Sequence, residues 1–192
     1  MAVTGGIYLA IAVNLFASAL STLTLVTYLF VYTPLKRKTP ICVLVGAFPG
    51  AMPPLIGWAA ATGRLNIEAG ILYAMLFLWQ FPHFMAIAWM YREDYDRAGY
   101  LVLPHDGSAR ARFVNCQTVV PLLALTPLSL LAGLACASRT FYWIGALFLS
   151  LGFLYYGMQF VLNKSGAAAG RLLVASIIYL PSLFVLIIVP RG

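Results

Sequence analysis

The chain has 192 residues, of which 62% are hydrophobic and only 9% are charged, and its mean hydropathy is +0.92. A soluble domain carries about 25% charged and about 45–50% apolar residues, so this chain lacks the polar surface of a water-soluble globule. The composition excludes a soluble enzyme and a disordered chain. The net charge of +7 indicates basic loops beside anionic lipid headgroups rather than a nucleic-acid interface. We predict an integral membrane protein surrounded by a lipid bilayer.

Six apolar runs, each long enough to cross a bilayer as a helix, follow one another along the chain. They cover residues 7–32, 41–62, 69–91, 113–137, 141–162 and 172–189. Their length and lack of alternation exclude a β-barrel, and helices then satisfy the backbone polar groups in lipid. The prediction is an all-α protein with six transmembrane helices in a single membrane domain over residues 1–192.

The basic residues predict the orientation of these helices. Nine of them lie in the loops after the first, third and fifth runs, and three lie on the other side, at positions 64, 139 and 191. Because loops rich in Lys and Arg stay inside, the loops after the odd-numbered runs are predicted to face the cytoplasm or the mitochondrial matrix. Of these two membranes we expect the inner membrane of a bacterium.

Acidic residues gather where the third run ends on the predicted cytoplasmic side. Glu93, Asp94 and Asp96 lie within residues 91–97, and Asp106 follows in the same loop. Two interpretations are open. Mixed charges at a helix end often form only a solvated boundary, whereas carboxylates at a membrane mouth can hold Mg²⁺ and, through it, a diphosphate.

Polar side chains inside the third run favour the functional interpretation. Gln80 and His83 lie at membrane depth, where polar residues are expensive and often functional. In one continuous helix of about 3.6 residues per turn, His83, Tyr91 and Asp94 would share a face leading to the cytoplasmic mouth. The alternative for His83 is a hydrogen bond to a neighbouring helix, to which a carbonyl freed by Pro82 could contribute.

Lys36, Arg37 and Lys38 follow the first run on the same predicted side as Asp94. As a positive-inside cluster they need no further role. They are also suited to contacts with phosphate oxygens, Arg through its planar fork and Lys as a point charge.

The second run is interrupted by Pro49 and by the pair Pro53 and Pro54, among small residues. This pattern predicts a broken helix with close helix packing. A broken helix together with a membrane-embedded histidine is also compatible with a transporter, although the two halves of the chain show no internal repeat.

Several sequence blocks, taken in order, point to one family. They are Tyr32-Thr33-Pro34-Leu35-Lys36-Arg37, residues 50–58 with Thr62-Gly63, Leu78-Trp79-Gln80-Phe81-Pro82-His83-Phe84, and Arg92-Glu93-Asp94-Tyr95 with Ala98-Gly99 and Leu103-Pro104. In this order and spacing the chain resembles the haem O synthases (protohaem IX farnesyltransferases) of the membrane prenyltransferase superfamily. The matching blocks cover about residues 28–104, and beyond them only the hydropathy agrees.

The resemblance implies a nine-helix α-bundle around a central cavity, in which the six helices here correspond to helices four to nine. It implies transfer of a farnesyl group from farnesyl diphosphate to a vinyl group of haem B, which gives haem O, with Mg²⁺ at the diphosphate. It also implies transient contact with haem A synthase or with the assembly of a terminal oxidase.

The same resemblance assigns roles to individual residues. Asp94 matches the second aspartate-rich motif of the family, which binds the diphosphate through Mg²⁺, and Asp96 is a less secure metal ligand. His83 matches the Pro-His pair of the family. Tyr91, whose spacing places it near the same helix face, joins His83 and Asp94 as a candidate catalytic residue. The candidate substrate-binding residues are Lys36, Arg37, Gln80 and Arg92.

Two departures from the family pattern change what we expect of this chain. No acidic residue precedes Glu68, so the first motif of the superfamily, an Asn with two downstream Asp, is missing, and position 98 is alanine where the wider superfamily has a further Asp. We therefore expect that about the first third of the protein is absent and that the chain alone is inactive. The alternatives are a quinone-type aromatic prenyltransferase and a non-catalytic membrane scaffold.

Overall fold

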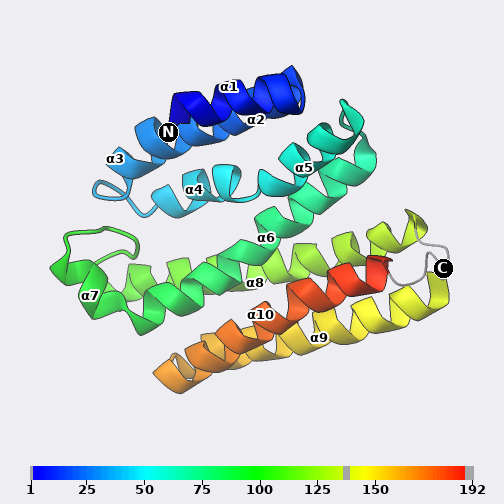
Figure 1. The fold of residues 1–192 in the computed structure, drawn as a ribbon. Coiled ribbons are helices and arrows are strands. Elements are labelled where there is room, and N and C mark those ends of the chain that lie inside the picture. Colours follow the sequence, from blue (N-terminus) through cyan, green and yellow to red (C-terminus); the bar gives the residue numbers. More distant parts are fainter. Residues whose placement is uncertain (1, 136–138, 189–192) are drawn as a thin grey trace. The chain divides into compact units, whose positions relative to one another are not determined.

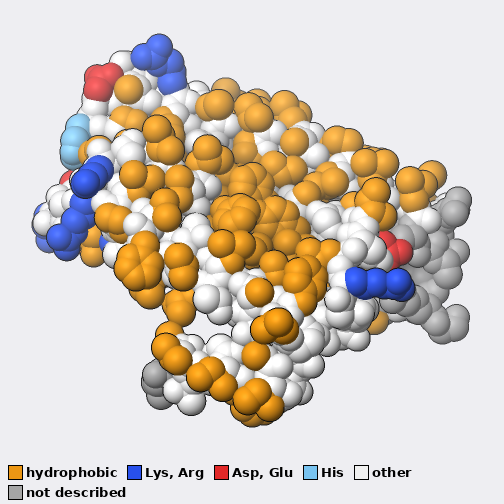
Figure 2. All heavy atoms as spheres, turned by 90° about the horizontal axis from the view of Figure 1, so that it is seen from above, with side chains coloured by type: hydrophobic (Ala, Val, Ile, Leu, Met, Phe, Trp, Pro, Cys, Tyr) orange, Lys and Arg blue, Asp and Glu red, His pale blue; other side chains and the backbone are white. Residues whose placement is uncertain are grey.

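The computed structural model describes residues 2–135 and 139–188, and all of the regular secondary structure in these ranges is helical. Six helices are long and apolar enough to cross a membrane, which confirms the predicted fold class. They are Leu15–Leu35, Cys42–Thr62, Ile67–Met90, Gly107–Ala132, Thr140–Asn163 and Gly166–Ile188. Broad hydrophobic areas cover the face drawn in Figure 2, as a surface in contact with lipid requires.

The chain divides into two compact units, Met1–Phe77 and Leu78–Gly192 (Figure 1). In the first unit, α1 (Ala2–Ala12) lies alongside α2 (Leu15–Val26), and the Ser18 hydroxyl donates to the Gly6 carbonyl at 2.7 Å. The predicted single helix over 7–32 is therefore wrong, because the chain turns back between α1 and α2. Asn14 makes this break: its backbone is extended and its side chain accepts from the Ala17 N–H at 2.8 Å as the N-cap of α2.

After α2, the first spanning helix contains a π-helical segment before the basic residues that follow it. The π-helix η1 (Thr27–Tyr32) leads into the short α3 (Thr33–Leu35), where Pro34 has no N–H to donate. The Thr33 backbone N–H bonds to the Tyr28 carbonyl five residues back, and the Thr33 hydroxyl donates to the same oxygen at 2.9 Å. Because of this wider turn, the Tyr28 carbonyl remains hydrogen-bonded and the helix continues past Pro34 to Leu35.

The second spanning segment is a broken helix, as predicted. It consists of α4 (Cys42–Gly50) and α5 (Pro53–Thr62), separated at Ala51 and Met52, with proline at the start of α5. A Cβ added to Gly46 of α4 would lie 2.7 Å from the Tyr32 ring, so glycine allows this close approach to η1. Gly63 ends α5 with φ of +69°, a left-handed conformation that glycine adopts without strain.

The division between the two units falls within α6 (Ile67–Met90), which is followed by α7 (Arg92–Arg97). In the second unit, α8 (Gly107–Ala132), α9 (Arg139–Asn163) and α10 (Gly166–Ile188) pack side by side (Figure 1), and the short helix η2 (Gly133–Ala135) follows α8. α8 and α10 begin about a turn and a half before the apolar runs at 113 and 172, because Asp106 and Ser165 cap them with bonds from Ala109 and Ala168 N–H. The predicted end of the fourth run, at 137, lies outside the described residues.

Buried hydroxyl groups join the helices of the second unit. The Tyr142 hydroxyl donates to the Ser129 carbonyl at 2.7 Å, and the Ser129 and Ser150 hydroxyls are 3.1 Å apart. The Ser150 hydroxyl is in turn 3.4 Å from that of Tyr179. Since lipid offers no replacement partners, this chain of bonds across α8, α9 and α10 stabilises their packing.

Candidate functional site

Two side chains of α6, Trp79 and His83, bind the same residue of α10, Ser176. The Trp79 indole N–H donates to the Ser176 carbonyl at 2.8 Å, and His83 Nδ1 lies 2.8 Å from the Ser176 hydroxyl oxygen. The His83 and Trp79 rings stack with centroids 4.6 Å apart and planes 23° apart. His83 thus has the inter-helix hydrogen bond that the sequence left open as one of its two interpretations.

Gln80 follows Trp79 on the same helix and is only 3% exposed. A buried amide must be hydrogen-bonded, because an unpaired one costs about 1–3 kcal/mol. Its burial at membrane depth agrees with a residue that lines the interior of the bundle.

The expected continuous helix face from His83 to Asp94 is wrong. α6 ends at Met90, and Tyr91 has φ of −105° and ψ of 21°, so the helix is interrupted before α7 begins. The Tyr91 side chain is 51% exposed. Residue spacing therefore does not relate Asp94 to His83, because the helical repeat is valid only where the helix is continuous.

Arg92 forms the junction between α6 and α7. Its guanidinium donates to the Trp89 carbonyl at 3.0 Å and lies 5.4 Å from the centroid of the Trp89 ring. The Trp89 indole N–H donates to the Lys164 carbonyl at 3.0 Å, which attaches this junction to the end of α9. Arg92 therefore has a structural role at the C-terminus of α6, where a cation is favourable.

The acidic residues of α7 are engaged with arginines. Asp94 forms an ion pair with Arg97 one turn later, and Asp96 lies 3.5 Å from the Arg110 guanidinium and 3.8 Å from His105 Nδ1. Glu93 is mostly exposed and pairs with Arg92 at 3.5 Å. Glu93 and Asp94 also lie in the first turn of α7, where negative charge is favourable.

Asp94 fits a magnesium site only as one part of it. Among the described residues, no three Asp, Glu, His or Cys side chains come together as metal ligands. Mg²⁺ is, however, usually held by one or two carboxylates together with substrate phosphates and water. The Asp94 side chain is 62% exposed, so its carboxylate is accessible to such a metal–diphosphate pair.

The basic cluster of the sequence lies directly after α3. Lys36 is half-buried and Arg37 and Lys38 are exposed, in a turn closed by the Lys38 N–H bond to the Leu35 carbonyl at 2.9 Å. These residues belong to the first unit and Asp94 to the second. Their joint contact with one diphosphate therefore stays a prediction.

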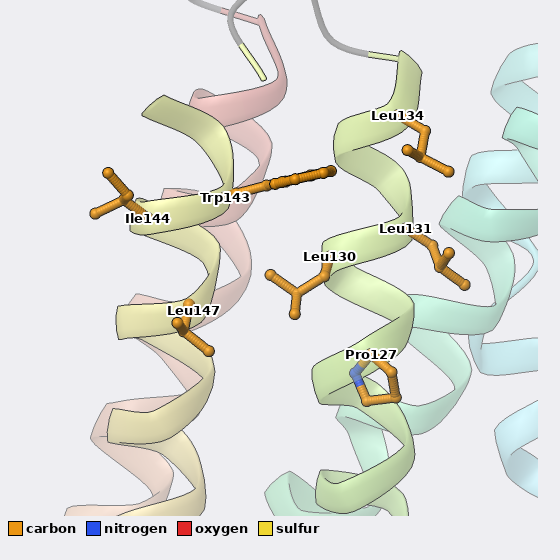
Figure 3. Close-up of a pocket in the computed structure, with 7 residues that line it drawn as sticks. All are labelled: Pro127, Leu130, Leu131, Leu134, Trp143, Ile144 and Leu147. Atoms are coloured by element: carbon orange, nitrogen blue, oxygen red, sulfur yellow. The ribbon is translucent and has the colours of Figure 1, made fainter. Parts of the chain in front are cut away.

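An open apolar pocket of about 490 Å³ lies between α8 and α9 (Figure 3). The Trp143 ring points from α9 toward α8 at one end, Pro127 lies at the other, and the remaining lining residues are Leu and Ile. The pocket contains none of the predicted site residues and no group that could bind a diphosphate. Its lining is apolar except for the indole nitrogen of Trp143.

Ser176 is the residue at this site that sequence reasoning missed. The available signal was a hydroxyl inside an apolar run, but such a hydroxyl most often bonds to its own helix. Nothing in the sequence indicates that a residue 93 positions beyond His83 lies next to it.

Comparison with known proteins identifies the family to which this chain belongs. The family model described as the UbiA prenyltransferase family matches residues 1–184. This chain belongs to that family. The description names a prenyltransferase family, and the six candidate spanning helices make the chain a multi-pass α-helical membrane protein.

Several relatives of this chain carry the same name. The chain is 45% identical to a protein named protoheme IX farnesyltransferase from Solibacter usitatus, and 41% identical to one from Koribacter versatilis; both matches cover 100% of this chain. It is 43% identical, over 93% of its length, to another from Cytophaga hutchinsonii. The chain spans 65%, 64% and 62% of the lengths of these three relatives. No solved structure matches it.

Proposed function

We propose that this UbiA chain is part of a haem O synthase, which transfers the farnesyl group of farnesyl diphosphate to a vinyl group of haem B. The observation that carries this proposal is the identity of 41–45% over the whole chain to relatives named protoheme IX farnesyltransferase. A quinone-type prenyltransferase of the same family is less well supported, because the relatives are named for haem. The relatives are bacterial, in accordance with a bacterial inner membrane.

The reaction breaks the bond between C1 of farnesyl and the diphosphate oxygen, and the electron pair leaves with the diphosphate. The vinyl group of haem B attacks the allylic cation at C1. Water then adds to the resulting cation and loses a proton, which forms the hydroxyethyl group of haem O. Because charge develops on the leaving diphosphate, fixed positive groups at that end lower the barrier most.

The residues around α7 are suited to the diphosphate end of this reaction. Mg²⁺ would supply positive charge to the diphosphate, and Asp94 would hold it, with Asp96 as a weaker candidate. Arg97 now pairs with Asp94 and would be released toward the phosphate oxygens when Asp94 takes a metal. Lys36 and Arg37 would add positive charge, and Arg92 would position α7 through Trp89.

The residues of α6 are suited to the haem end. Gln80 and His83 lie at membrane depth, where a hydrophobic macrocycle and a farnesyl chain are both soluble. Tyr91 stands between the two ends at the break after α6. Haem O leaves in the membrane, so the enzyme that consumes it, such as a haem A synthase or an assembling terminal oxidase, is the expected transient partner.

A chimera tests the proposed activity. Residues 1–192 replace the matching segment of the Solibacter usitatus relative, and membranes containing the chimera receive haem B, farnesyl diphosphate and Mg²⁺. Chromatographic detection of haem O, with none formed when Mg²⁺ is chelated, is the expected result. Prenylation of a quinone precursor without haem O would select the alternative, and no product from a chimera that is stably inserted would contradict both.

A further inference from the structure

The bond between Ser176 and His83 determines which nitrogen of the imidazole carries the proton. The Ser176 hydroxyl donates its only hydrogen to the Leu173 carbonyl, at 2.6 Å. In the contact with His83 Nδ1 at 2.8 Å, the Ser176 oxygen must therefore accept. It follows that Nδ1 of His83 carries a hydrogen and that Nε2 of the neutral ring has a free lone pair.

The ring is held in one orientation from three sides. Trp79 stacks on it, and the Trp79 indole is itself bonded to the carbonyl of Ser176. Phe84 meets the ring with its centroid 5.6 Å away and its plane at 61°. Ser176 is completely buried, so this acceptor has no water to compete with it.

The depth of this arrangement fits a membrane-soluble ligand better than an aqueous one. His83 lies seven residues before the end of α6 at Met90, which corresponds to about 10 Å along the helix axis. A diphosphate at the membrane surface does not extend to that depth without leaving water, whereas a porphyrin does so favourably.

We propose that Ser176 is a positioning residue that presents Nε2 of His83 as an axial ligand to the iron of haem B; this rests on the proposed function. Histidine ligands of metals typically donate their other N–H to an oxygen acceptor, which fixes the tautomer and raises the basicity of the ligating nitrogen. Imidazole is also a common axial ligand of haem iron. Binding through Nε2 would hold the macrocycle in one place while its vinyl group reacts.

A haem titration of the 192-residue chain in detergent tests this assignment without any turnover. Ferrous haem B is added to the wild-type chain and to three variants, His83→Ala, Ser176→Ala and Ser150→Ala. His83→Ala should lose the histidine-ligated Soret band, and Ser176→Ala should bind haem about 10–100-fold more weakly. Ser150→Ala removes a buried hydroxyl that does not touch His83, so its haem affinity should stay at the wild-type value.

The iron–histidine stretching band distinguishes a positioning role of Ser176 from a role in helix packing alone. Loss of the acceptor in Ser176→Ala lowers the basicity of Nε2, so the band in the resonance Raman spectrum of the ferrous complex should move to lower frequency. Ser176→Thr keeps the hydroxyl and should restore the wild-type band. If Ser176→Ala does not fold, His83→Gly with added imidazole replaces it: recovery of the Soret band is the expected result, and no recovery contradicts the ligand.

The possible failures are distinguishable. A wild-type chain that binds haem with a spectrum unchanged in His83→Ala overturns the ligand assignment and leaves the proposed reaction intact. An unchanged iron–histidine band in a folded Ser176→Ala variant overturns the role of Ser176 alone. A folded wild-type chain that binds no haem overturns the ligand, and the chimera's haem O activity then decides the proposed function separately.

Discussion

The side-chain amide of Asn14 donates to the Ala59 carbonyl at 2.9 Å and so joins the start of α2 to α5. The same amide lies 3.3 Å from the Ala60 carbonyl, while its oxygen accepts from the Ala17 N–H. One residue therefore ends the α1–α2 turn, caps α2 and connects two spanning segments. In lipid these three bonds have no substitute from water.

Replacement of Asn14 should destabilise the first unit. Asn14→Ala removes the cap and both inter-helix bonds, and we expect a loss of about 1–3 kcal/mol of unfolding free energy. Asn14→Asp keeps the cap but cannot donate to Ala59, so it should lose most of the same amount. Urea unfolding in mixed micelles measures both, with Ser21→Ala, which removes a bond within α2 only, as the control. Equal stability of Asn14→Asp and wild type would contradict the inter-helix role.

Asp94→Asn in the active chimera should lower the rate of haem O formation by about 10²–10³-fold, because one preorganised charge at the leaving diphosphate is lost. Asp106→Asn is the matched control, since asparagine caps a helix as well as aspartate does and this residue has no proposed ligand. Activity of Asp94→Asn within about threefold of wild type, which corresponds to ~0.7 kcal/mol, would exclude the metal role.

The start of α8 should loosen in acid. The Ser108 hydroxyl at 2.6 Å, and then the Ala109 N–H at 2.9 Å, bond to the Asp106 carboxylate and lower the pKa of Asp106 below its usual value. Because the pKa of Asp106 is lower in the folded state than its unfolded value of about 4, the cap stabilises the folded state when the pH is above that unfolded value. This stabilisation is lost as the pH falls through the pKa of the folded state. Hydrogen exchange of residues 107–112 should therefore rise between pH 6 and pH 3 relative to Asp106→Asn, whose cap does not titrate. Equal pH profiles would contradict this cap.

Lys164 should be replaceable by glycine with a gain in stability. Its φ is 45°, a left-handed conformation that costs an L-residue about 1–2 kcal/mol, and it contributes its backbone carbonyl, not its side chain, to the bond with Trp89. Lys164→Gly should raise the unfolding temperature in detergent by about 2–4 °C for each kcal/mol gained, and the β-branched Lys164→Val should lower it. A decrease with glycine as large as that with valine would show that the lysine side chain is needed.

The sequence alone predicted the spanning helices, the break in the second span and the family of this protein. Hydropathy predicted the six spanning helices because the bilayer requires about 20 apolar residues for each of them. Pro49, Pro53 and Pro54 predicted the broken second span, since proline removes a helix donor wherever it stands. The ordered blocks from Tyr32 to Pro104 predicted the prenyltransferase family, which the match over residues 1–184 confirms.

Only the tertiary structure decided where helices end within apolar sequence and which side chains meet. The break at Asn14 lies inside an apolar run, and the break at Tyr91 lies where an apolar run passes into a charged segment. Hydropathy predicts neither break, because it depends on side-chain polarity and not on backbone angles. The partner of His83 is Ser176 and that of Trp89 is Lys164, 93 and 75 residues further along the chain. Such pairs depend on how whole helices pack against one another. The sequence around either residue would be the same whether or not the two residues were in contact.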